Sequence, residues 1–376
     1  MPQKLRMFFY KNFTTLDISP RKQLRFGYRR TRTQGVVSLS IPKQPDPPKD
    51  GLRPVNLRTD LAPLADLIEL AFADTMDNSG RAAVREMRYL SRMGPGLNVL
   101  AGVSDLTQGI GLGYVWIEDG RLIGNVSIYP ANWPAAAGDA WIIANVAVHP
   151  DFRGRGIAHK LMLASLETIR RRSKRRDHPI AILQVENSNS VAQHLYERLG
   201  FTRERVWTHW RRSANARLPA PIDHAVGYIT RRRRGEWHAE YALAQCARPA
   251  KTGGIGWLRP THPSFFRKPI LVALNDLINL RSIERLVIRS RDEQSLLAVM
   301  WIESAFAAAT VQLTIMTDPA VQGLYDEALI NLATRRYTNR SALAIEHPAD
   351  DTFTSALLQR YNFTPQRTLL HMRWEG

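Results

Sequence analysis

From about residue 50 onward, the apolar positions of the chain begin to follow the periods of secondary structure. Residues 55–57 fit a short strand, and the apolar residues after Thr59 and Asp60, either of which can cap a helix, recur at helical spacing. The stretch that continues to about residue 113 is rich in Arg and Gly and shows no sustained period. The pattern therefore predicts a strand, a helix and an irregular segment.

A hairpin and a buried strand come next. Residues 114–117 and 122–129 flank Asp119-Gly120, a dipeptide that is favoured in tight turns because both residues adopt positive φ readily. Residues 141–148 are nearly all apolar, which is typical of a strand covered on both faces, and His149-Pro150 ends this strand.

The following residues alternate helices and strands. A helical pattern begins at Ile157 and ends in an Arg-rich run, where cations complement the helix dipole. Residues 180–185 fit a strand, Ser188 or Asn189 can cap another helix, and residues 206–211 fit a last strand. The order predicts an α/β (α+β) fold in which helices flank a mixed, mostly antiparallel sheet.

An internal repeat indicates that this fold occurs twice. Residues 198–205 (Arg-Leu-Gly-Phe-Thr-Arg-Glu-Arg) and 360–367 (Arg-Tyr-Asn-Phe-Thr-Pro-Gln-Arg) align, and the same register relates His209 to His371. Upstream, residues 311–319 resemble residues 143–150 as an apolar strand ended by proline. We therefore predict a first copy of the fold at residues 51–213 and a second copy at residues 220–376.

Charge distinguishes the N-terminal stretch from both copies. The chain of 376 residues has 52 Lys and Arg against 34 Asp and Glu, a formal net charge of +18. Residues 1–50 hold 11 of these cations, three Asp and no Glu, and they end in a Pro-rich run. Because no amphipathic helical period accompanies this charge, we predict a basic tail and a semi-rigid linker rather than an organelle-targeting peptide.

Composition also limits the chemistry. Cys246 is the only cysteine, so neither an internal disulfide nor a zinc site built from cysteines can form, and we expect no metal. A single thiol fits a reducing, cytoplasmic location. The sequence contains no run of 18 apolar residues that would suggest a membrane span.

The strongest chemical signal is residues 153–158, Arg-Gly-Arg-Gly-Ile-Ala, between the buried strand and the helix. Backbone N–H groups at such a turn, together with the helix dipole, bind anions. Gly156 lets the backbone approach a pyrophosphate, while Arg153 and Arg155 add positive charge. A plain loop with solvated arginines is the simpler alternative. The P-loop pattern and the Gly-x-Gly-x-x-Gly pattern of dinucleotide-binding folds are both missing from the sequence.

Residues 145–158, Asn-Val-Ala-Val-His-Pro-Asp-Phe-Arg-Gly-Arg-Gly-Ile-Ala, resemble motif A of the GNAT N-acetyltransferases. Residues 183–201 are similar to the family's motif B, especially in the branch that acetylates ribosomal-protein amino termini. The resemblance implies two tandem acyl-CoA N-acyltransferase (GNAT) folds, acetyl-CoA as the acyl donor and a primary amine as the acceptor. The cofactor-binding residues that it implies are Val146, Ala147, Val148, Arg153, Gly154, Arg155, Gly156, Ile157, Ala158, Asn189 and Tyr196.

The resemblance further implies direct attack of the amine on the thioester in a ternary complex, without an acyl-enzyme. Tyr196 lies at the position whose hydroxyl protonates the departing thiolate, although its spacing alone favours an aromatic residue on a buried helix face. The branch has Leu-Glu-Val where this chain has Leu183-Gln184-Val185, and glutamine cannot be a general base. We predict Glu186 as the base. Asp139, Glu118 and a water chain are the alternatives, and a solvated loop carboxylate is the alternative role of Glu186.

The second copy departs from both motifs. It has Gln-Gly-Leu-Tyr-Asp-Glu at residues 322–327 in place of residues 153–158, and Leu358 in place of Tyr196. Two acidic residues at a helix start would repel phosphate. We therefore expect a degenerate GNAT fold that has lost cofactor binding and supplies structure or part of the acceptor cleft.

Two other functions are compatible with the sequence. Gln184 leaves a non-catalytic acyl-CoA sensor as an alternative. The basic tail and the runs at residues 170–176 and 231–234 allow a nucleic-acid-binding protein, but these runs lack interleaved aromatic residues, so solvated helix ends are favoured. We expect no membrane partner. We also expect a monomer, because an internal duplication can replace the contact between two single-domain chains.

Overall fold

The computed structural model describes residues 50–74, 76, 78–92, 112–131, 133–173, 178–222, 229–267, 281–305 and 308–376. The predicted basic tail therefore lies outside the described residues, apart from Asp50. The first half contains β1 (Gly51–Pro54), α1 (Leu61–Ala71), α2 (Asn78–Ser91), β2 (Tyr114–Glu118), β3 (Arg121–Pro130), β4 (Ala140–Val148), α5 (Ile157–Arg172), β5 (Ile180–Glu186), α6 (Ser190–Arg198) and β6 (Thr202–Arg212). The second half contains β7 (Thr230–Arg231), α7 (Trp237–Ala247), β8 (Arg281–Arg289), β9 (Leu296–Ala305), β10 (Thr310–Thr317), α9 (Asp326–Tyr337), β11 (Ala342–Pro348), α10 (Thr352–Arg360) and β12 (Thr364–Glu375).

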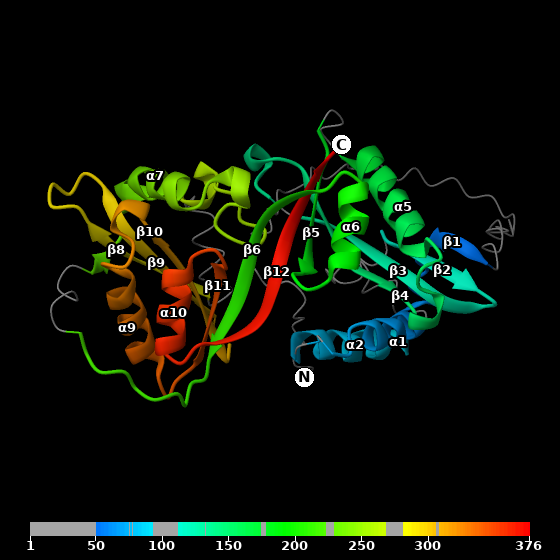
Figure 1. Ribbon diagram of the computed structural model, residues 1–376, viewed down its shortest axis with the longest axis horizontal. Coiled ribbons are helices and arrows are strands. Elements are labelled where there is room, and N and C mark those ends of the chain that lie inside the picture. The colour runs from blue at the N-terminus through cyan, green and yellow to red at the C-terminus, as the bar shows by residue number, and fades with distance from the viewer. Residues whose placement is uncertain are drawn as a thin grey trace, which may run out of the picture.

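These strands form one sheet, along which the two copies lie end to end (Figure 1). Its order is β1-β2-β3-β4-β5-β12-β6-β11-β10-β9-β8-β7. The parallel pairs are β4 with β5 and β10 with β11, and the chain connects each pair through a helix, α5 or α9. The other neighbouring pairs are antiparallel, so the prediction of a mixed, mostly antiparallel sheet with flanking helices is confirmed.

The two copies exchange their last strands. β12 lies between β5 and β6, with His371 opposite Gln184, and β6 pairs with β11, with His209 opposite Glu346. β6 and β12 also pair with each other and run through the middle of the molecule (Figure 1). Each copy therefore completes the sheet of the other, and residues 51–213 and 220–376 remain predicted repeat units that share one sheet.

Helices cover both faces of this sheet. In the first half, α5 and α6 lie on one face and α1 and α2 on the other, and in the second half α9 and α10 lie opposite α7 (Figure 1). β4 illustrates the consequence, because Trp141 and Ile143 join the core under α5 while Ile142 and Ala144 join a second apolar cluster with Trp257. The nearly continuous apolar run of this strand reflects burial on two faces.

The hairpin and the cap of α6 agree with the sequence pattern, whereas Asp60, the N-cap residue of α1, binds Arg53 and the Asn56 N–H instead of capping the helix with its side chain. Asp119 and Gly120 have φ of 49° and 69° between β2 and β3. Asn189, rather than Ser188, caps α6, because its side chain accepts a hydrogen bond from the Ala192 N–H at 3.0 Å. Local turn and capping chemistry was therefore sufficient to place these features.

Two expectations for the start of the first copy were wrong. The first strand is β1, because residues 51–54 pair with β2, whereas residues 55–57 precede α1 and Val55 and Leu57 pack against the α1–α2 cluster. The segment expected to be irregular contains α2, whose buried Val84, Met87 and Leu90 recur at helical spacing. The frequent arginines of α2 masked its narrow apolar stripe.

Candidate functional site

A V-shaped opening separates the ends of β4 and β5. The two strands pair only from Ala140–Ile180 to Ile142–Ile182, although β4 continues to Val148 and β5 to Glu186. A bulge accompanies the opening, since the register with β3 gains one residue and Asn145 has a φ of 52°. The backbone of Val146, Ala147 and Val148 therefore lies along a strand edge that β5 does not cover.

The glycine turn lies directly after this opening. Gly154 and Gly156 have φ of 78° and 75°, in the left-handed region that favours glycine, and Gly156 is the N-cap of α5. A Cβ on either glycine would meet no atom within 4 Å, so the backbone conformation explains the choice of glycine. Ile157 is buried and anchors the helix, while residues 153–156 are exposed. The N–H groups that begin α5 are thus available to an anion.

The two arginines of the turn differ in their partners. Arg153 donates from Nε to the backbone oxygen of Val148 at 3.2 Å, and no carboxylate among the described residues lies within ion-pair distance of it. Arg155 forms an ion pair with Glu118 at 2.8 Å and lies over the ring of Phe152. Arg153 is therefore the cation of the turn that is free to meet a ligand. Glu118, an alternative for the general base, is paired with Arg155.

Tyr196 points into the core under α5 and α6. It is 6% exposed and packs near Phe201, with ring centroids 5.9 Å apart. Burial raises the pKa of the Tyr196 hydroxyl, so the phenol stays protonated at neutral pH. No hydrogen bond to this hydroxyl occurs in the described part of the chain. Tyr196 is thus a core aromatic residue whose hydroxyl is kept in the form that donates a proton.

The carboxylate predicted as the general base has a partner from the second copy. Glu186 is half-buried at the end of β5, and Arg367 of β12 binds its Oε1 through NH2 at 2.7 Å and Nε at 2.8 Å. On the same strand, the side-chain nitrogen of Gln184 lies 2.8 Å from Nε2 of His371. The sequence indicated neither contact. The alignment of His371 with His209 was the available signal, but it did not show the strand exchange.

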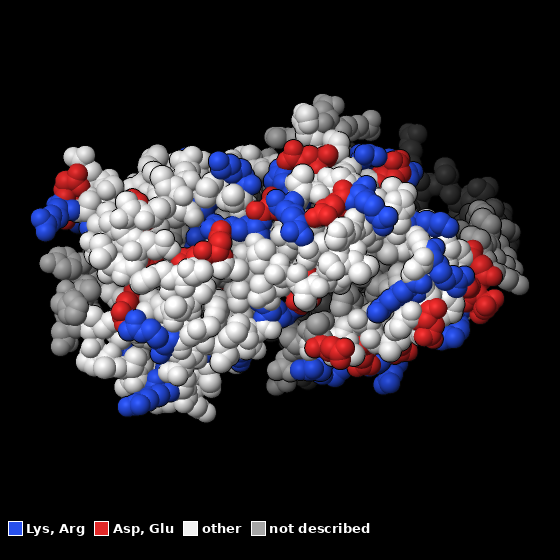
Figure 2. All heavy atoms as spheres, in the orientation of Figure 1, with Lys and Arg blue, Asp and Glu red and all other residues white. Residues whose placement is uncertain are grey.

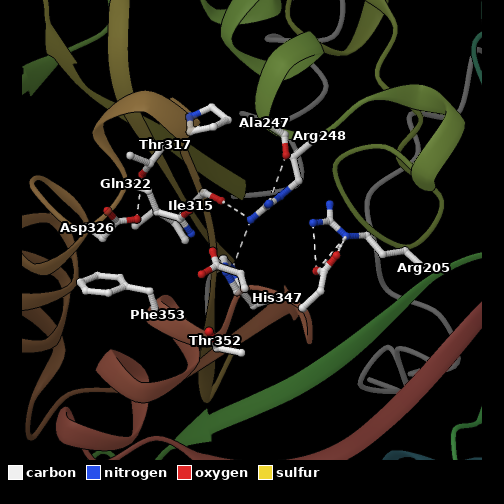
Figure 3. Close-up of a pocket in the computed structure, with 13 residues that line it drawn as sticks. Arg205, Ala247, Arg248, Ile315, Thr317, Gln322, Asp326, His347, Thr352 and Phe353 are labelled. Carbon is white, nitrogen blue, oxygen red and sulfur yellow. Dashed lines mark hydrogen bonds and ion pairs between the residues drawn. The ribbon is translucent and has the colours of Figure 1, made fainter.

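The second copy has a corresponding opening that side chains line. β10 and β11 pair only as far as Leu313–Ile345, and a cavity of about 240 Å³ lies beyond this point (Figure 3). Arg248, at the end of α7, enters the cavity and donates to the backbone oxygen of Ile315 at 3.2 Å. Burial lowers the pKa of Arg248 to about 10, which leaves the guanidinium charged.

The helix start in the second copy is occupied as well. Asp326 accepts hydrogen bonds from the Gly323 N–H at 2.7 Å and from the Thr317 hydroxyl at 2.8 Å. Its carboxylate therefore occupies a backbone N–H group of the turn that corresponds to the glycine turn of the first copy, and this N–H is not available to a ligand. A phosphate at this position would meet a buried negative charge.

The basic runs have internal partners. Arg231, Arg232 and Arg233 form ion pairs with Glu284, Glu240 and Glu293 at 3.2, 3.1 and 2.9 Å. On the face that Figure 2 shows, Lys and Arg are interspersed with Asp and Glu over both halves. Residues 174–176 of the other run lie outside the described residues. The visible arrangement does not form the continuous basic stripe that suits a nucleic-acid backbone.

Two further properties concern membranes and metals. In the described ranges, no helix combines the length and apolar character that crossing a membrane requires. The same ranges contain no group of three His, Cys, Asp or Glu side chains that could hold a metal ion.

Comparison with known proteins supports one family. Residues 99–201 match the model of the acetyltransferase (GNAT) family. The chain is 34% identical over 102 residues to a mycothiol acetyltransferase from Geodermatophilus obscurus, covering 26% of this chain and 30% of that protein. It is 36% identical over 75 residues to N-alpha-acetyltransferase 30 from Schizosaccharomyces pombe, covering 20% of this chain and 47% of that protein. The matches thus span less than half of each relative.

Solved structures extend the likeness to the whole fold. A GCN5-related N-acetyltransferase from Sphaerobacter thermophilus aligns over 88% of this chain and 96% of that chain, with a TM-score of 0.57 at 18% identity. The matched family model covers β2 to α6, which contain the splayed strands and the glycine turn. Residues 99–201 therefore match the GNAT family, and the predicted fold of two tandem GNAT units is confirmed by the likeness over the whole chain.

Proposed function

We propose that the first copy binds acetyl-CoA and transfers its acetyl group to a primary amine. The observation that carries this proposal is the exposed turn with two left-handed glycines at the start of α5, beside the splayed ends of β4 and β5. A helix N-terminus with free N–H groups suits a pyrophosphate. The uncovered edge of β4 suits the amide groups of a pantetheine arm, which can pair with it as a strand would.

The residues of the site then have distinct roles. Residues 153–158 hold the pyrophosphate, Val146 to Val148 hold the pantetheine arm, and Asn189 combines its capping role with a contact to the donor. The amine attacks the acetyl carbonyl directly, and Tyr196 donates its proton to the departing thiolate. The buried Tyr196 hydroxyl is protonated and so has a proton to donate, while its raised pKa makes it a weaker acid than a solvated phenol.

A second function deserves a direct test because of Gln184. In a non-catalytic sensor, acetyl-CoA would bind in the same place but no acetyl group would be transferred. Gln184 favours this alternative, since an amide cannot deprotonate an amine. The two functions therefore share the cofactor site and differ only in turnover.

The experiment uses the full chain, because strand exchange ties the two copies together. Calorimetric titration with acetyl-CoA is expected to show one site per chain. Two sites would overturn the expectation that the second copy is degenerate, and no binding at millimolar acetyl-CoA would overturn the proposal.

Incubation with radiolabelled acetyl-CoA and a cell extract separates the enzyme from the sensor. A labelled small molecule or protein is the expected result, and it also reveals the class of the acceptor. Binding without transfer would support the sensor. The cytoplasmic location and the monomeric state remain predictions, which fractionation and light scattering would check.

A further inference from the structure

A row of polar side chains, of which His371 is buried and Glu346 largely so, crosses the junction between the two copies. Gln184 on β5 contacts His371 on β12 at 2.8 Å, and Glu346 on β11 lies 3.3 Å from the same His371 nitrogen. The other end of the row is His209 on β6, whose Nε2 lies 3.5 Å from Glu346 Oε1. The roles proposed above for Tyr196 and Glu186 leave these three charged or titratable groups without a function.

The row follows from the repeat and the strand exchange. His209 and His371 are equivalent positions of the two copies, and the same register relates Gln184 to Glu346. In each copy, the central position of the splayed strand faces a histidine that the other copy supplies. The carboxylate missing at Gln184 is thus present at Glu346, and His371 lies between the two positions.

The surroundings keep His371 in a reactive form. Its side chain is 2% exposed, stacked on Trp207 and in edge contact with Trp257, with centroid distances of 5.6 and 5.0 Å. Burial lowers the pKa of His371, although Glu346 opposes this, so the ring is neutral at neutral pH. The side-chain nitrogen of Gln184 can donate to Nε2 when this nitrogen is unprotonated, and in that tautomer Nε2 carries the lone pair.

Glu346 is suited to stabilise a proton on this ring. Burial would raise the pKa of Glu346, but contacts with His209 and His371 hold it below its usual range. Its second oxygen accepts a hydrogen bond from the Trp257 N–H at 3.0 Å. Within the described residues, no Lys or Arg forms an ion pair with Glu346, so the two imidazoles are its cationic partners when protonated.

His371 also lies next to the acyl-transfer site. Gln184, its direct partner, is on β5 beyond Ile182, where the pairing with β4 has ended. A cavity of about 20 Å³, enough for one water, is lined by His371 and Ile182, and its other charged lining residues are Glu204, Arg259 and Arg373. A water held in this space would contact the imidazole beside Ile182, the last residue of β5 that pairs with β4.

We propose that His371, supplied by the second copy, accepts the proton that the amine loses at the first copy's site. This inference rests on the proposed acetyl transfer. The amine nitrogen forms a bond to the acetyl carbon and the carbon–sulfur bond breaks. The amine's proton moves through one water to His371 Nε2, and the thiolate takes a proton from Tyr196. After the product leaves, His371 releases its proton to solvent and the Tyr196 phenolate takes one up, which restores the site. Glu346 and Gln184 are positioning residues, which stabilise the imidazolium and orient the ring.

The test compares His371→Gln with its repeat-related control His209→Gln in the full chain. Label transfer from radiolabelled acetyl-CoA into a cell extract is measured against pH, with acetyl-CoA affinity and circular dichroism measured for each variant. We expect His371→Gln to slow transfer about 100-fold with unchanged acetyl-CoA affinity, and His209→Gln to slow it less than about threefold. Equal losses in both variants, or a wild-type rate in His371→Gln, would overturn the inference.

Two more variants keep the test informative if His371→Gln does not fold. Glu346→Gln removes the charge that raises the pKa of His371, so the acidic limb of the rate profile is expected to move to lower pH by about one unit. An unmoved limb would contradict the role of His371. Gln184→Glu in the His371→Gln background is expected to restore about a tenth of the rate by supplying a carboxylate at the branch position.

The outcomes separate this inference from the proposed function. If the wild-type chain transfers no label, the proposed function fails and the inference fails with it. If the wild type transfers label while both His371→Gln and Glu346→Gln keep its rate and pH profile, only the inference fails. In that case Glu186→Ala would be the next variant to test the remaining predicted base.

Discussion

The two strand-to-helix turns of the chain have similar backbones and different chemistry. Gly154 and Gly156 of the first copy and Gly323 of the second all have positive φ. In the first copy the helix start is exposed and lacks acidic residues, whereas in the second copy Asp326 accepts the Gly323 N–H at 2.7 Å. A left-handed glycine therefore does not by itself make an anion site. The free N–H groups and the charge around them decide it.

The openings between the strands differ in the same way. The second copy satisfies the uncovered edge of β10 internally, because Arg248 donates to the Ile315 oxygen at 3.2 Å. Among the described residues, no side chain is seen to take that role at Val146 or Ala147 in the first copy. In the first copy Arg153 donates to the Val148 oxygen at the end of the strand, so the edge at Val146 and Ala147 is left open to a ligand or to solvent.

The largest effect is expected from Gly156→Val. A β-branched residue at a φ of 75° is strained and would reshape the turn, so acetyl-CoA affinity should fall about 1,000-fold, or about 4 kcal/mol. Calorimetry measures the affinity. The control Gly323→Val, which is also strained and would push on Phe353, should lower stability without changing affinity. If Gly156→Val binds acetyl-CoA within threefold of the wild type, the two turns do not differ in their contribution to binding.

The next effect concerns Glu204, whose repeat-related position in the second copy is the neutral Gln366. Burial raises the pKa of Glu204 to about 7, against the opposing charge of Arg373. The folded protein therefore holds a proton that the unfolded chain releases, so this group's stabilising contribution is lost as pH rises from about 4.5 to 7. Between pH 4.5 and 8 the free energy of unfolding of the wild type should fall by about 3 kcal/mol because of this group, and Glu204→Gln should not show this fall. Urea unfolding at the two pH values measures the difference. Parallel pH dependence in both proteins would contradict the raised pKa.

Tyr196→Phe tests the position that the second copy fills with Leu358. Loss of the hydroxyl should lower kcat about 100-fold, or about 2.7 kcal/mol, while acetyl-CoA affinity and stability change little. The raised pKa predicts that the wild-type rate shows no alkaline decline from this group below about pH 10. Steady-state rates with the amine identified in the labelling experiment check both points. An unchanged kcat would show that Tyr196 has only a structural role in the core.

The smallest effect is expected from Arg153→Met. Because no described carboxylate neutralises this guanidinium, its removal should weaken acetyl-CoA binding about tenfold and reduce the dependence on salt. The matched change in the second copy is Gln322→Met, which should leave the affinity unchanged. If both variants bind alike, Arg153 is a solvated loop residue, as the simpler interpretation of the sequence holds.

Much of the first copy could be predicted because its signals are local. Asp119-Gly120 makes a hairpin and Asn189 caps a helix through contacts within a few residues. The glycine turn could also be predicted, since Gly154 and Gly156 adopt the left-handed backbone conformation that other residues avoid. The α2 helix was missed although Val84, Met87 and Leu90 recur at helical spacing, because charged residues separate these apolar positions along the sequence.

Motif spacing and residue identity were enough to predict the family match, the repeat and which copy has the exposed glycine turn, because these properties are local to short segments. Only the tertiary structure decided that β12 lies beside β5, so that Arg367 binds Glu186 and His371 contacts Gln184. These partners are more than 180 positions apart in the chain, and a strand's choice of neighbour depends on how the whole sheet buries its faces. For that reason the contribution of the second copy to the site became visible only in the fold.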